Sequence, residues 1–398
     1  MITRHLQSTL ITLLAEYPAV VLLGPRQIGK TTLAVNLGEE LNGMYRDLER
    51  PRDLDQVRDI ELFQAQYPER LLILDEVQRA PEIFAPLRGV IDRRRRDGQR
   101  SGQFLFLGSA SLKLLGQTSE SLAGRVAYAE LSGINALELA SAAAQDLNPL
   151  WVRGGYPDSL TARSEAISLK WRLDLIRTYL ERDVPQFGFR VPAETLRRFW
   201  TMLAHHQGGL FNASSLGEGL GLSGQTVSRY LDILVDLLLV RRLEPWYANI
   251  GKRLVKSPKV YIRDSGLLHA LLAIEDADSL LSHPVIGASW EGFVVENLLS
   301  CLSASLWQPY FYRTQAGAEI DLVLVKAGKP EVAIEVKRAS APKAQRGFHQ
   351  ACDDLGITHR YIVYPGDEAY RLSTSDIWVT PLTTLMSTLR DRRGLSFG

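Results

Sequence analysis

The fold is decided by the stretch Ala19-Val-Val-Leu-Leu-Gly-Pro-Arg-Gln-Ile-Gly-Lys-Thr-Thr32, where a short apolar run leads into a glycine-rich turn and then a helical pattern. Residues 24–31 match G-x-x-x-x-G-K-[ST], the Walker A pattern. Glycines let backbone N–H groups curl around a phosphate, and the start of a helix adds a partial positive charge. The stretch therefore predicts a phosphate-binding loop between a buried strand and a helix.

This loop predicts ATP and Mg²⁺ as cofactors. Lys30 is expected to reach the β- and γ-phosphates, and the Thr31 hydroxyl to ligate Mg²⁺. The alternative, a glycine turn with a chance lysine, does not account for the strand and helix on either side. The predicted nucleotide-binding residues are Gly24, Pro25, Arg26, Gln27, Ile28, Gly29, Lys30, Thr31, Thr32 and Asp75.

A second acidic element follows the apolar run 71–74, which ends in Asp75 and Glu76. Open α/β sheets bind ligands at the carboxyl ends of their strands. We expect Asp75 to hold Mg²⁺ through water and Glu76 to orient or deprotonate the attacking water. The alternative is a pair of ordinary solvated loop acids.

Two further residues are candidates for contact with the γ-phosphate. Ser109 follows the apolar run 104–107, so it is placed to touch the γ-phosphate or the attacking water. Arg125 is predicted to sense the γ-phosphate, either in its own chain or from a neighbouring subunit. The alternative for Arg125 is a solvated arginine or one paired within its loop.

Composition limits the class of protein. The chain has 398 residues with 46 Lys or Arg against 45 Asp or Glu, which excludes a histone-like basic protein and an acidic tail. Two cysteines, Cys301 and Cys352, provide neither a disulfide framework nor a cysteine-rich zinc module. Apolar runs fall short of the ~18 residues that a membrane span needs. These features predict a cytoplasmic, multidomain protein without a membrane partner.

The order of the elements predicts the fold class. Short apolar strands alternate with helical stretches up to about residue 140, which indicates a parallel α/β sheet of the P-loop NTPase type. We expect this first domain at residues 1–140, a helical domain at 141–260 and a small α/β domain at 261–398.

The middle domain contains a candidate helix-turn-helix at residues 214–234. Gly221 would supply the turn and Ser223 would cap the second helix, whose Gln225 and Arg229 would face away from its apolar stripe. Residues 190–260 hold ten Lys or Arg against five Asp or Glu, and these include Lys252, Arg253, Lys256 and Lys259. The segment is typical of nucleic-acid contacts, or alternatively of a spacer or protein-docking module.

The C-terminal part predicts a pair of facing carboxylates. If the hairpin between residues 319–325 and 331–337 is centred on Gly328, then Asp321 lies opposite Glu335. Lys337 then lies on the same side of its strand as Glu335. Facing carboxylates repel each other unless a cation neutralises them.

This geometry is the D…E-x-K arrangement of Mg²⁺-dependent nucleases, with Asp321, Glu335 and Lys337 as catalytic candidates. Glu291 shares a helical stripe with apolar residues and is a further candidate metal ligand. The predicted metal ligands are therefore Thr31 and Asp75 in the first domain and Glu291, Asp321 and Glu335 in the last. The alternatives are an exposed hairpin with solvated charges, or a nuclease fold that has lost its chemistry.

These residues together resemble a prokaryotic family of AAA-type P-loop ATPases that are joined to a C-terminal domain of unknown function resembling PD-(D/E)xK nucleases. The resemblance implies an ATP-binding core, a winged-helix-like middle and a restriction-endonuclease-like end. The stretches that carry it are 24–32, 74–78, 108–109, 153–157, 179–183, 252–253, 257–259, 261–264, 290–291 and 335–337.

Two functions follow from this sequence. The first is an ATPase that couples its nucleotide state to a C-terminal nuclease-like domain and acts on nucleic acid. The second is an ATP-controlled molecular switch, or regulator, whose C-terminal domain is a non-catalytic binding scaffold. Nucleic acid, a protein partner or further copies of the same chain are the partners that these functions imply.

Overall fold

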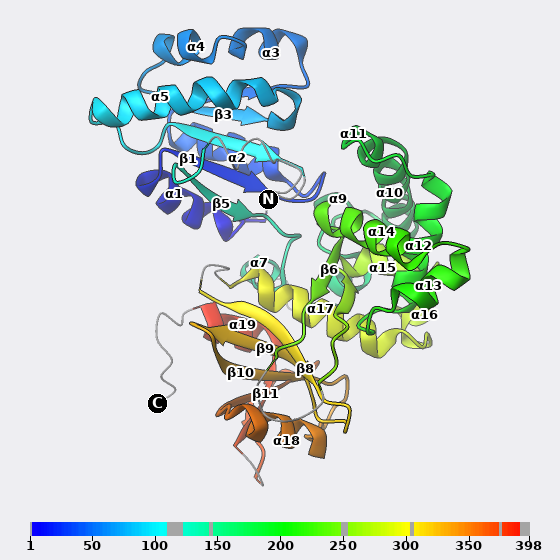
Figure 1. Ribbon diagram of the computed structural model, residues 1–398. Helices are drawn as coiled ribbons and strands as arrows, with labels where there is room; N and C mark the ends of the chain where they lie inside the picture. The colour runs from blue at the N-terminus through cyan, green and yellow to red at the C-terminus, as the bar shows by residue number, and fades with distance from the viewer. Residues whose placement is uncertain are drawn as a thin grey trace. The chain divides into compact units, whose positions relative to one another are not determined.

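The computed structural model describes residues 2–109, 122–142, 146–247, 254–302, 306–373 and 376–390 (Figure 1). The chain divides into two compact units, residues 1–133 with 234–238 and residues 134–233 with 239–398. Over the described ranges, the helices are too short or too polar to cross a membrane.

The first unit is built on a five-stranded parallel sheet with the order β2-β3-β4-β1-β5. Every residue of the three central strands is buried, which explains why they are continuous apolar runs rather than alternating patterns. The predicted α/β fold is therefore confirmed. The strands are β1 (Ala19–Leu23), β2 (Gly43–Asp47), β3 (Leu71–Asp75), β4 (Phe104–Gly108) and β5 (Val126–Glu130).

Helices cover both faces of this sheet. Leu87 and Val90 of α5 belong to one core cluster with Leu72 and Phe106 of the sheet. Ile73 follows Leu72 in β3, so its side chain points to the opposite face of the sheet. Helix α2 packs on that face, because a Cβ built on Gly38 of α2 would lie 3.0 Å from Ile73. The helices of this unit are α1 (Leu6–Glu16), α2 (Lys30–Glu40), α3 (Pro51–Val57), α4 (Ile60–Gln66) and α5 (Phe84–Arg96), with 3₁₀ turns η1 (Val77–Arg79) and η2 (Pro81–Ile83).

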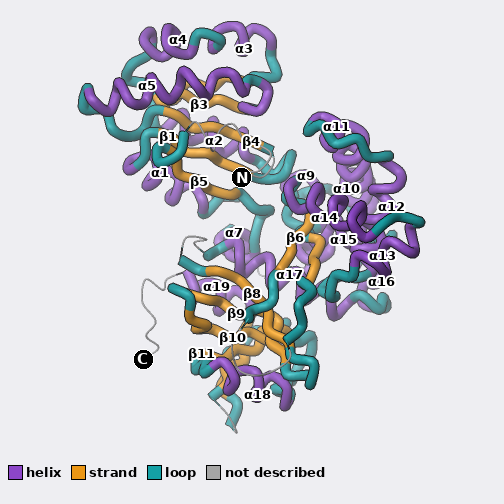
Figure 2. The backbone as a smooth tube through the Cα atoms, in the orientation of Figure 1, coloured by secondary structure: helices purple, strands orange, loops and turns teal. Residues whose placement is uncertain are grey.

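The second unit begins with helices (Figure 2). They are α7 (Ala136–Ser141), α8 (Asn148–Arg153), α9 (Pro157–Leu160), α10 (Glu165–Thr178), the π-helical turn η3 (Tyr179–Asp183), α11 (Val184–Gln186), α12 (Ala193–His205), α13 (Ala213–Leu220), α14 (Gly224–Asp236, in this unit up to residue 233), α15 (Ser265–Leu271), α16 (Ala277–Leu281) and α17 (Ile286–Ser300). Strands β6 (Val240–Leu243) and β7 (Lys259–Ile262) form a separate antiparallel pair.

The predicted turn between two helices is confirmed at α13 and α14. Gly221 ends α13 in the left-handed conformation at φ 66°, and the Ser223 hydroxyl accepts the Thr226 N–H at 3.2 Å. Val227 of the apolar stripe is buried, while Gln225 and Arg229 are exposed. The antiparallel pair β6–β7 follows these two helices in the chain. Lys252 and Arg253 lie outside the described residues.

The same unit ends in a six-stranded mixed sheet with the order β12-β13-β11-β10-β9-β8. Phe348 and Cys352 of α18 pack against Val323 and Ile362 on one face of this sheet. The elements are β8 (Gln308–Arg313), β9 (Glu319–Lys326), β10 (Lys329–Val336), α18 (Arg346–Leu355), β11 (His359–Tyr364), β12 (Tyr370–Arg371), β13 (Ile377–Pro381) and α19 (Leu382–Arg390).

The β9–β10 hairpin tests the predicted register. Leu322 pairs with Ile334, which is the predicted alignment and places Asp321 beside Glu335. Nearer the turn, Lys326 pairs with Lys329, one residue out of that alignment. A bulge between Pro330 and Val332 absorbs the difference. The register prediction is therefore confirmed along the strands and wrong at the turn, which is centred between residues 327 and 328.

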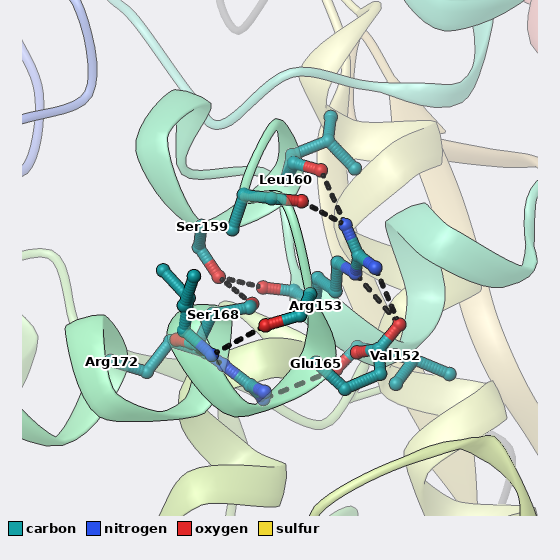
Figure 3. A network of polar contacts seen from close by, with 10 residues as sticks. Val152, Arg153, Ser159, Leu160, Glu165, Ser168 and Arg172 are labelled. Carbon is teal, nitrogen blue, oxygen red and sulfur yellow. Dashed lines mark hydrogen bonds and ion pairs between the residues drawn. The ribbon is translucent and has the colours of Figure 1, made fainter.

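A buried polar network fastens the segment from α8 to α10 (Figure 3). The fully buried Arg172 donates to the carbonyls of Val152 at 3.2 Å and Gly266 at 2.9 Å. Arg153 makes two hydrogen bonds to one Glu165 oxygen, at 2.7 and 2.9 Å. Burial lowers the pKa of Arg172 to about 10, so the guanidinium remains charged at neutral pH. These contacts give the stretch 153–157 a structural role in the second unit.

Candidate functional site

The phosphate loop has the backbone that the sequence predicts. Gly29, the N-cap of α2, has φ 98°, which favours glycine. A Cβ on Gly24 would lie 2.6 Å from the Leu131 carbonyl oxygen, so the loop needs glycine there for close approach. The Lys30 ammonium is buried and donates to the carbonyls of Gly24 at 2.8 Å and Pro25 at 2.9 Å. The cation is therefore already held inside the loop.

The other predicted loop residues have different exposures. Ile28 is buried, and its carbonyl accepts the Arg4 guanidinium at 3.1 Å, which ties the loop to the start of the chain. Arg26 is half-buried, and Gln27 and Thr32 are exposed. The loop thus has a buried, anchored part at Ile28 and an exposed part at Gln27 and Thr32.

Thr31 and Asp75 meet as predicted. The Thr31 hydroxyl donates to Asp75 Oδ2 at 2.7 Å, and the Glu76 N–H donates to Asp75 Oδ1 at 2.9 Å. Hydroxyl and carboxylate oxygens are ligands that suit Mg²⁺, so these residues fit the cofactor that the loop implies.

Tyr45 is a residue that sequence reasoning missed. Its hydroxyl donates to Asp75 Oδ2 at 2.8 Å from the neighbouring strand β2. Burial and the charge of Asp75 raise the pKa of Tyr45 well above its usual value, so the hydroxyl remains a donor. Tyr45 could have been predicted as part of the site only from the order of the strands in the sheet, and a single sequence does not give that order.

Glu76 lies beside Asp75 in the left-handed conformation, at φ 54°. The Gln78 amide donates to Glu76 Oε2, and the Ser109 hydroxyl donates to the same oxygen at 3.4 Å. Burial raises the pKa of Glu76; the Lys30 charge opposes this shift and the Asp75 charge adds to it. Strand β4 lies between β1 and β3, which brings Ser109 between the phosphate loop and Glu76. Gln78 is the second residue whose role the sequence did not indicate.

Arg125 lies elsewhere in the same unit. It precedes β5, whose first residue Val126 pairs with Ala19, the first residue of β1. The phosphate loop follows the last residue of β1, roughly 13–17 Å away along a five-residue strand. Arg125 forms a two-bond ion pair with Asp92, at 2.7 and 2.9 Å. The structure therefore shows Arg125 paired with Asp92 of α5 and hydrogen-bonded to the Ala123 carbonyl of its own loop. It does not bring Arg125 to the phosphate loop of its own chain.

In the second unit, acidic residues surround one lysine, and we call this group the Lys259 cluster. The Lys259 ammonium lies 3.0 Å from Glu319, 3.1 Å from Glu291 and 3.3 Å from Asp321. The Lys259 side chain is only 4% exposed. The Tyr261 hydroxyl donates to the same Glu291 oxygen as Lys259, at 2.6 Å. The prediction that Lys259 belongs to a phosphate-binding surface is therefore wrong, because its charge is used inside the domain.

Glu335 and Lys337 pair with each other at 2.8 Å, beside the Lys259 cluster. Asp321 Oδ2 accepts the Val336 N–H at 3.0 Å, which holds Asp321 next to this pair. Burial raises the pKa of Glu335, and the Lys337 charge opposes that shift. The predicted trio of Asp321, Glu335 and Lys337 is thus brought together.

The predicted metal set Glu291, Asp321 and Glu335 is not assembled as a metal site. Glu291 and Asp321 both bind the Lys259 ammonium, whereas Glu335 binds Lys337. Among the described residues, no group of three or more His, Cys, Asp or Glu is arranged to hold a metal ion. These residues therefore do not fit a divalent metal, because an ammonium occupies the position between the carboxylates.

The electrostatics of this cluster favours the charged form of Lys259. Burial acts to lower the pKa of Lys259, but Tyr261 and the surrounding carboxylates outweigh it and hold that pKa well above its usual value. Burial and the Asp321 charge raise the pKa of Glu291, while Lys259 opposes the shift. These interactions favour the cationic form of Lys259.

Comparisons with family models divide the chain into three consecutive domains. Residues 16–140 match the model of an AAA domain, residues 144–278 a domain of unknown function (DUF8612), and residues 286–385 another domain of unknown function (DUF4143). Two curated relatives are 46% identical over 371 residues, which is 93% of this chain and 81% of each relative. They are uncharacterized proteins, Rv2008c of Mycobacterium tuberculosis and Mb2031c of Mycobacterium bovis.

Solved structures resemble the chain more distantly. The Walker-type ATPase of Pyrococcus abyssi is 14% identical, with a TM-score of 0.46 over 68% of this chain and 96% of its own. The RuvB Holliday junction branch migration motor of Thermotoga maritima is 17% identical, with a TM-score of 0.30 over 60% and 88%. The Orc1 protein of Aeropyrum pernix, solved with DNA, is 14% identical, with a TM-score of 0.29 over 68% and 93%.

Proposed function

This chain belongs to the family of the two mycobacterial relatives and contains an AAA domain, and from that premise we propose that it is an ATP-hydrolysing molecular switch. In this proposal its nucleotide state controls how the rest of the chain binds nucleic acid. The observation that carries the ATPase part is the convergence of Thr31, Asp75, Glu76 and Ser109 at the carboxyl edge of one parallel sheet.

The residues of the site support a hydrolytic step. Lys30 would turn from the Gly24 and Pro25 carbonyls to the β- and γ-phosphates of ATP. Glu76 would take a proton from water as that water attacks the γ-phosphorus, and the bond to the β-phosphate oxygen would break to release ADP. Thr31 and Asp75 would hold Mg²⁺, which when bound neutralises charge on the phosphates.

The hydrogen bonds of Glu76 suggest how hydrolysis would be controlled. Gln78 and Ser109 both donate to the Glu76 oxygen that would otherwise accept a proton from water. A γ-phosphate contact by Ser109 would remove one of these donors. The carboxylate would then be released towards the water only when ATP is bound.

The proposal for nucleic acid rests on the middle of the chain. Residues 190–260 carry ten Lys or Arg against five Asp or Glu. Lys259 is one of the ten and is used inside the domain, whereas Gln225, Arg229 and Lys256 are exposed. The helices α13 and α14, followed by the β6–β7 pair, support a winged-helix-like domain with α14 as the contact helix. Phosphate contacts of this kind would weaken steeply as salt concentration rises.

Two functions are predicted for the C-terminal domain: a Mg²⁺-dependent nuclease and a non-catalytic binding scaffold. Asp321, Glu335 and Lys337 have the D…E-x-K order that supports the nuclease. The ion pairs between Lys259 and the surrounding carboxylates favour the scaffold, because they occupy two of the three predicted metal ligands. We therefore propose a nuclease-like domain that binds without cleaving.

Lys30→Ala tests the nucleotide site. We expect affinity for a fluorescent ATP analogue to fall by about 10- to 150-fold, because one charged hydrogen-bonding group contributes roughly 1.5–3 kcal/mol. Lys170→Ala is the matched control, since Lys170 is an exposed lysine paired with Asp174 on α10. Unchanged binding by Lys30→Ala would refute the assigned loop. In the same titrations, DNA affinity that does not depend on nucleotide would refute the switch.

The raised pKa of Glu76 predicts a pH dependence. A general base must be deprotonated, so turnover should fall as pH decreases through the pKa of Glu76. Burial raises that pKa, which places the acidic limb of kcat above the value of about 4.3 that is usual for a glutamate. Steady-state kcat across pH, with nucleotide binding followed in parallel, measures this. A limb at or below the usual value would contradict the role of Glu76.

A further inference from the structure

We propose that the Lys259 ammonium is the resident cation of the C-terminal carboxylate cluster, and that this cluster binds a divalent metal only when Lys259 is removed. The inference concerns the C-terminal domain and does not depend on ATP hydrolysis. Its ligand class in the absence of Lys259 is a hard divalent cation that prefers oxygen ligands, such as Mn²⁺ or Mg²⁺.

The contacts of Lys259 are those of a bound cation. An ammonium has three N–H donors and no acceptor, and Lys259 lies within 3.3 Å of three carboxylates. The Phe311 ring lies 5.7 Å from the ammonium and adds a cation–π contact. The buried charge is thus neutralised from several sides, as a metal ion between these carboxylates would be.

The backbone fixes Lys259 in this position. Lys259 is the first residue of β7 and pairs with Leu243 of β6. It also forms an isolated bridge with Leu210. Because neighbouring segments hold the backbone on both sides, the ammonium reaches the cluster from a constrained position. The position of its backbone therefore keeps the Lys259 ammonium in the cluster, unlike that of a surface lysine whose side chain could turn back to solvent.

Charge balance shows why removal would create a metal site. Glu291, Glu319 and Asp321 are three carboxylates around one ammonium, and the Arg313 guanidinium lies 3.6 Å from Glu319. Acidic groups therefore outnumber basic groups with Lys259 present, and the excess would grow without it. Like charges at this separation repel strongly when partly buried. A divalent cation would restore the balance that Lys259 now provides.

Glu335 is a further carboxylate beside the cluster. It is 5% exposed, pairs with Lys337 through Oε1, and is also stabilised by the Gln345 backbone N–H. The β9–β10 register places Glu335 beside Asp321. A cation that replaced the ammonium near Asp321 would have this further carboxylate oxygen within the same strand pair.

The experiment measures Mn²⁺ binding to the full chain without nucleotide, by the loss of the free Mn²⁺ EPR signal. We expect Lys259→Met, which keeps the length of the side chain, to gain one site per chain. Its affinity should exceed any binding by the unsubstituted cluster by at least about tenfold. Asp321→Asn added to Lys259→Met should abolish the new site. Lys256→Met, an exposed lysine in the same segment, is the matched control and should gain none.

Two outcomes would overturn the proposal. One is a folded Lys259→Met protein, by circular dichroism, that gains no Mn²⁺ site. The other is Mn²⁺ binding by the unsubstituted chain that Asp321→Asn abolishes, which would show that a metal already displaces Lys259. The second measurement uses no Lys259 variant, so it decides the question even if Lys259→Met does not fold. ATP turnover measured on the same samples reports separately on the proposed ATPase.

Discussion

Glu76→Gln is expected to lower the rate of ATP turnover by about 10²- to 10⁴-fold while nucleotide binding is retained. The amide has nearly the same shape as the carboxylate but cannot accept a proton from the attacking water. Glu76 is half-buried beside Asp75 and Ser109, so the amide would keep its place in the site. Phosphate release and binding of a fluorescent ATP analogue measure the two quantities separately.

The matched control for this substitution is Glu82→Gln. Glu82 is exposed in the turn η2 (Pro81–Ile83), a few residues further along the same segment. We expect its turnover to stay within about twofold of the unsubstituted chain, as for most surface substitutions. If Glu76→Gln and Glu82→Gln had equal turnover, Glu76 could not be the base. Loss of binding in Glu76→Gln would instead point to a role in holding the loop.

Asp264→Ala is expected to destabilise the second unit by about 3–5 kcal/mol, because it removes two charge-assisted hydrogen bonds from a largely enclosed position. Asp264 Oδ2 accepts the Gly155 N–H at 2.7 Å, and Oδ1 accepts the Leu267 N–H at 2.8 Å as the N-cap of α15. The alanine variant would leave both donors unpaired. It would also remove a carboxylate whose charge opposes the lowering of the pKa of the buried Arg172 guanidinium.

Asp276→Ala provides the comparison for this effect. Asp276 is also a helix N-cap, and it accepts the Ser279 N–H at 2.8 Å, but it lies at the surface on α16. An N-cap of this kind contributes about 0.5–2 kcal/mol. Urea midpoints and Tm values of the two variants give the difference directly. Equal losses for Asp264→Ala and Asp276→Ala would show that the buried contacts of Asp264 add nothing beyond capping.

The local parts of the candidate site could be predicted from the sequence. The loop from Gly24 to Thr31 depends on backbone freedom and on the following helix, and both are encoded within a few neighbouring residues. The positions of Asp75 and Ser109 follow from strands that are parallel and therefore end at one edge. The cap at Ser223 and the turn at Gly221 are local for the same reason.

Contacts between distant segments could not be predicted in this way. Tyr45 reaches Asp75 because β2 lies next to β3, and Arg125 is remote from the phosphate loop because it precedes β5 rather than following it. The bulge between Pro330 and Val332 changes the hairpin register at the turn, although the bounds of both strands were predicted to within two residues. Each of these outcomes depends on pairing order, which a hydrophobic pattern does not contain.

The phosphate loop, the parallel α/β sheet and the approach of Asp321 to Glu335 could be predicted from the residues, because they depend on short-range backbone geometry and on the alternation of strands. The position of Lys259 among Glu291, Glu319 and Asp321 is visible only in the folded chain. In the sequence that lysine is one of several in a basic segment. Burial decides its role, because a charge removed from water must be neutralised by whichever opposite charges the fold brings within reach.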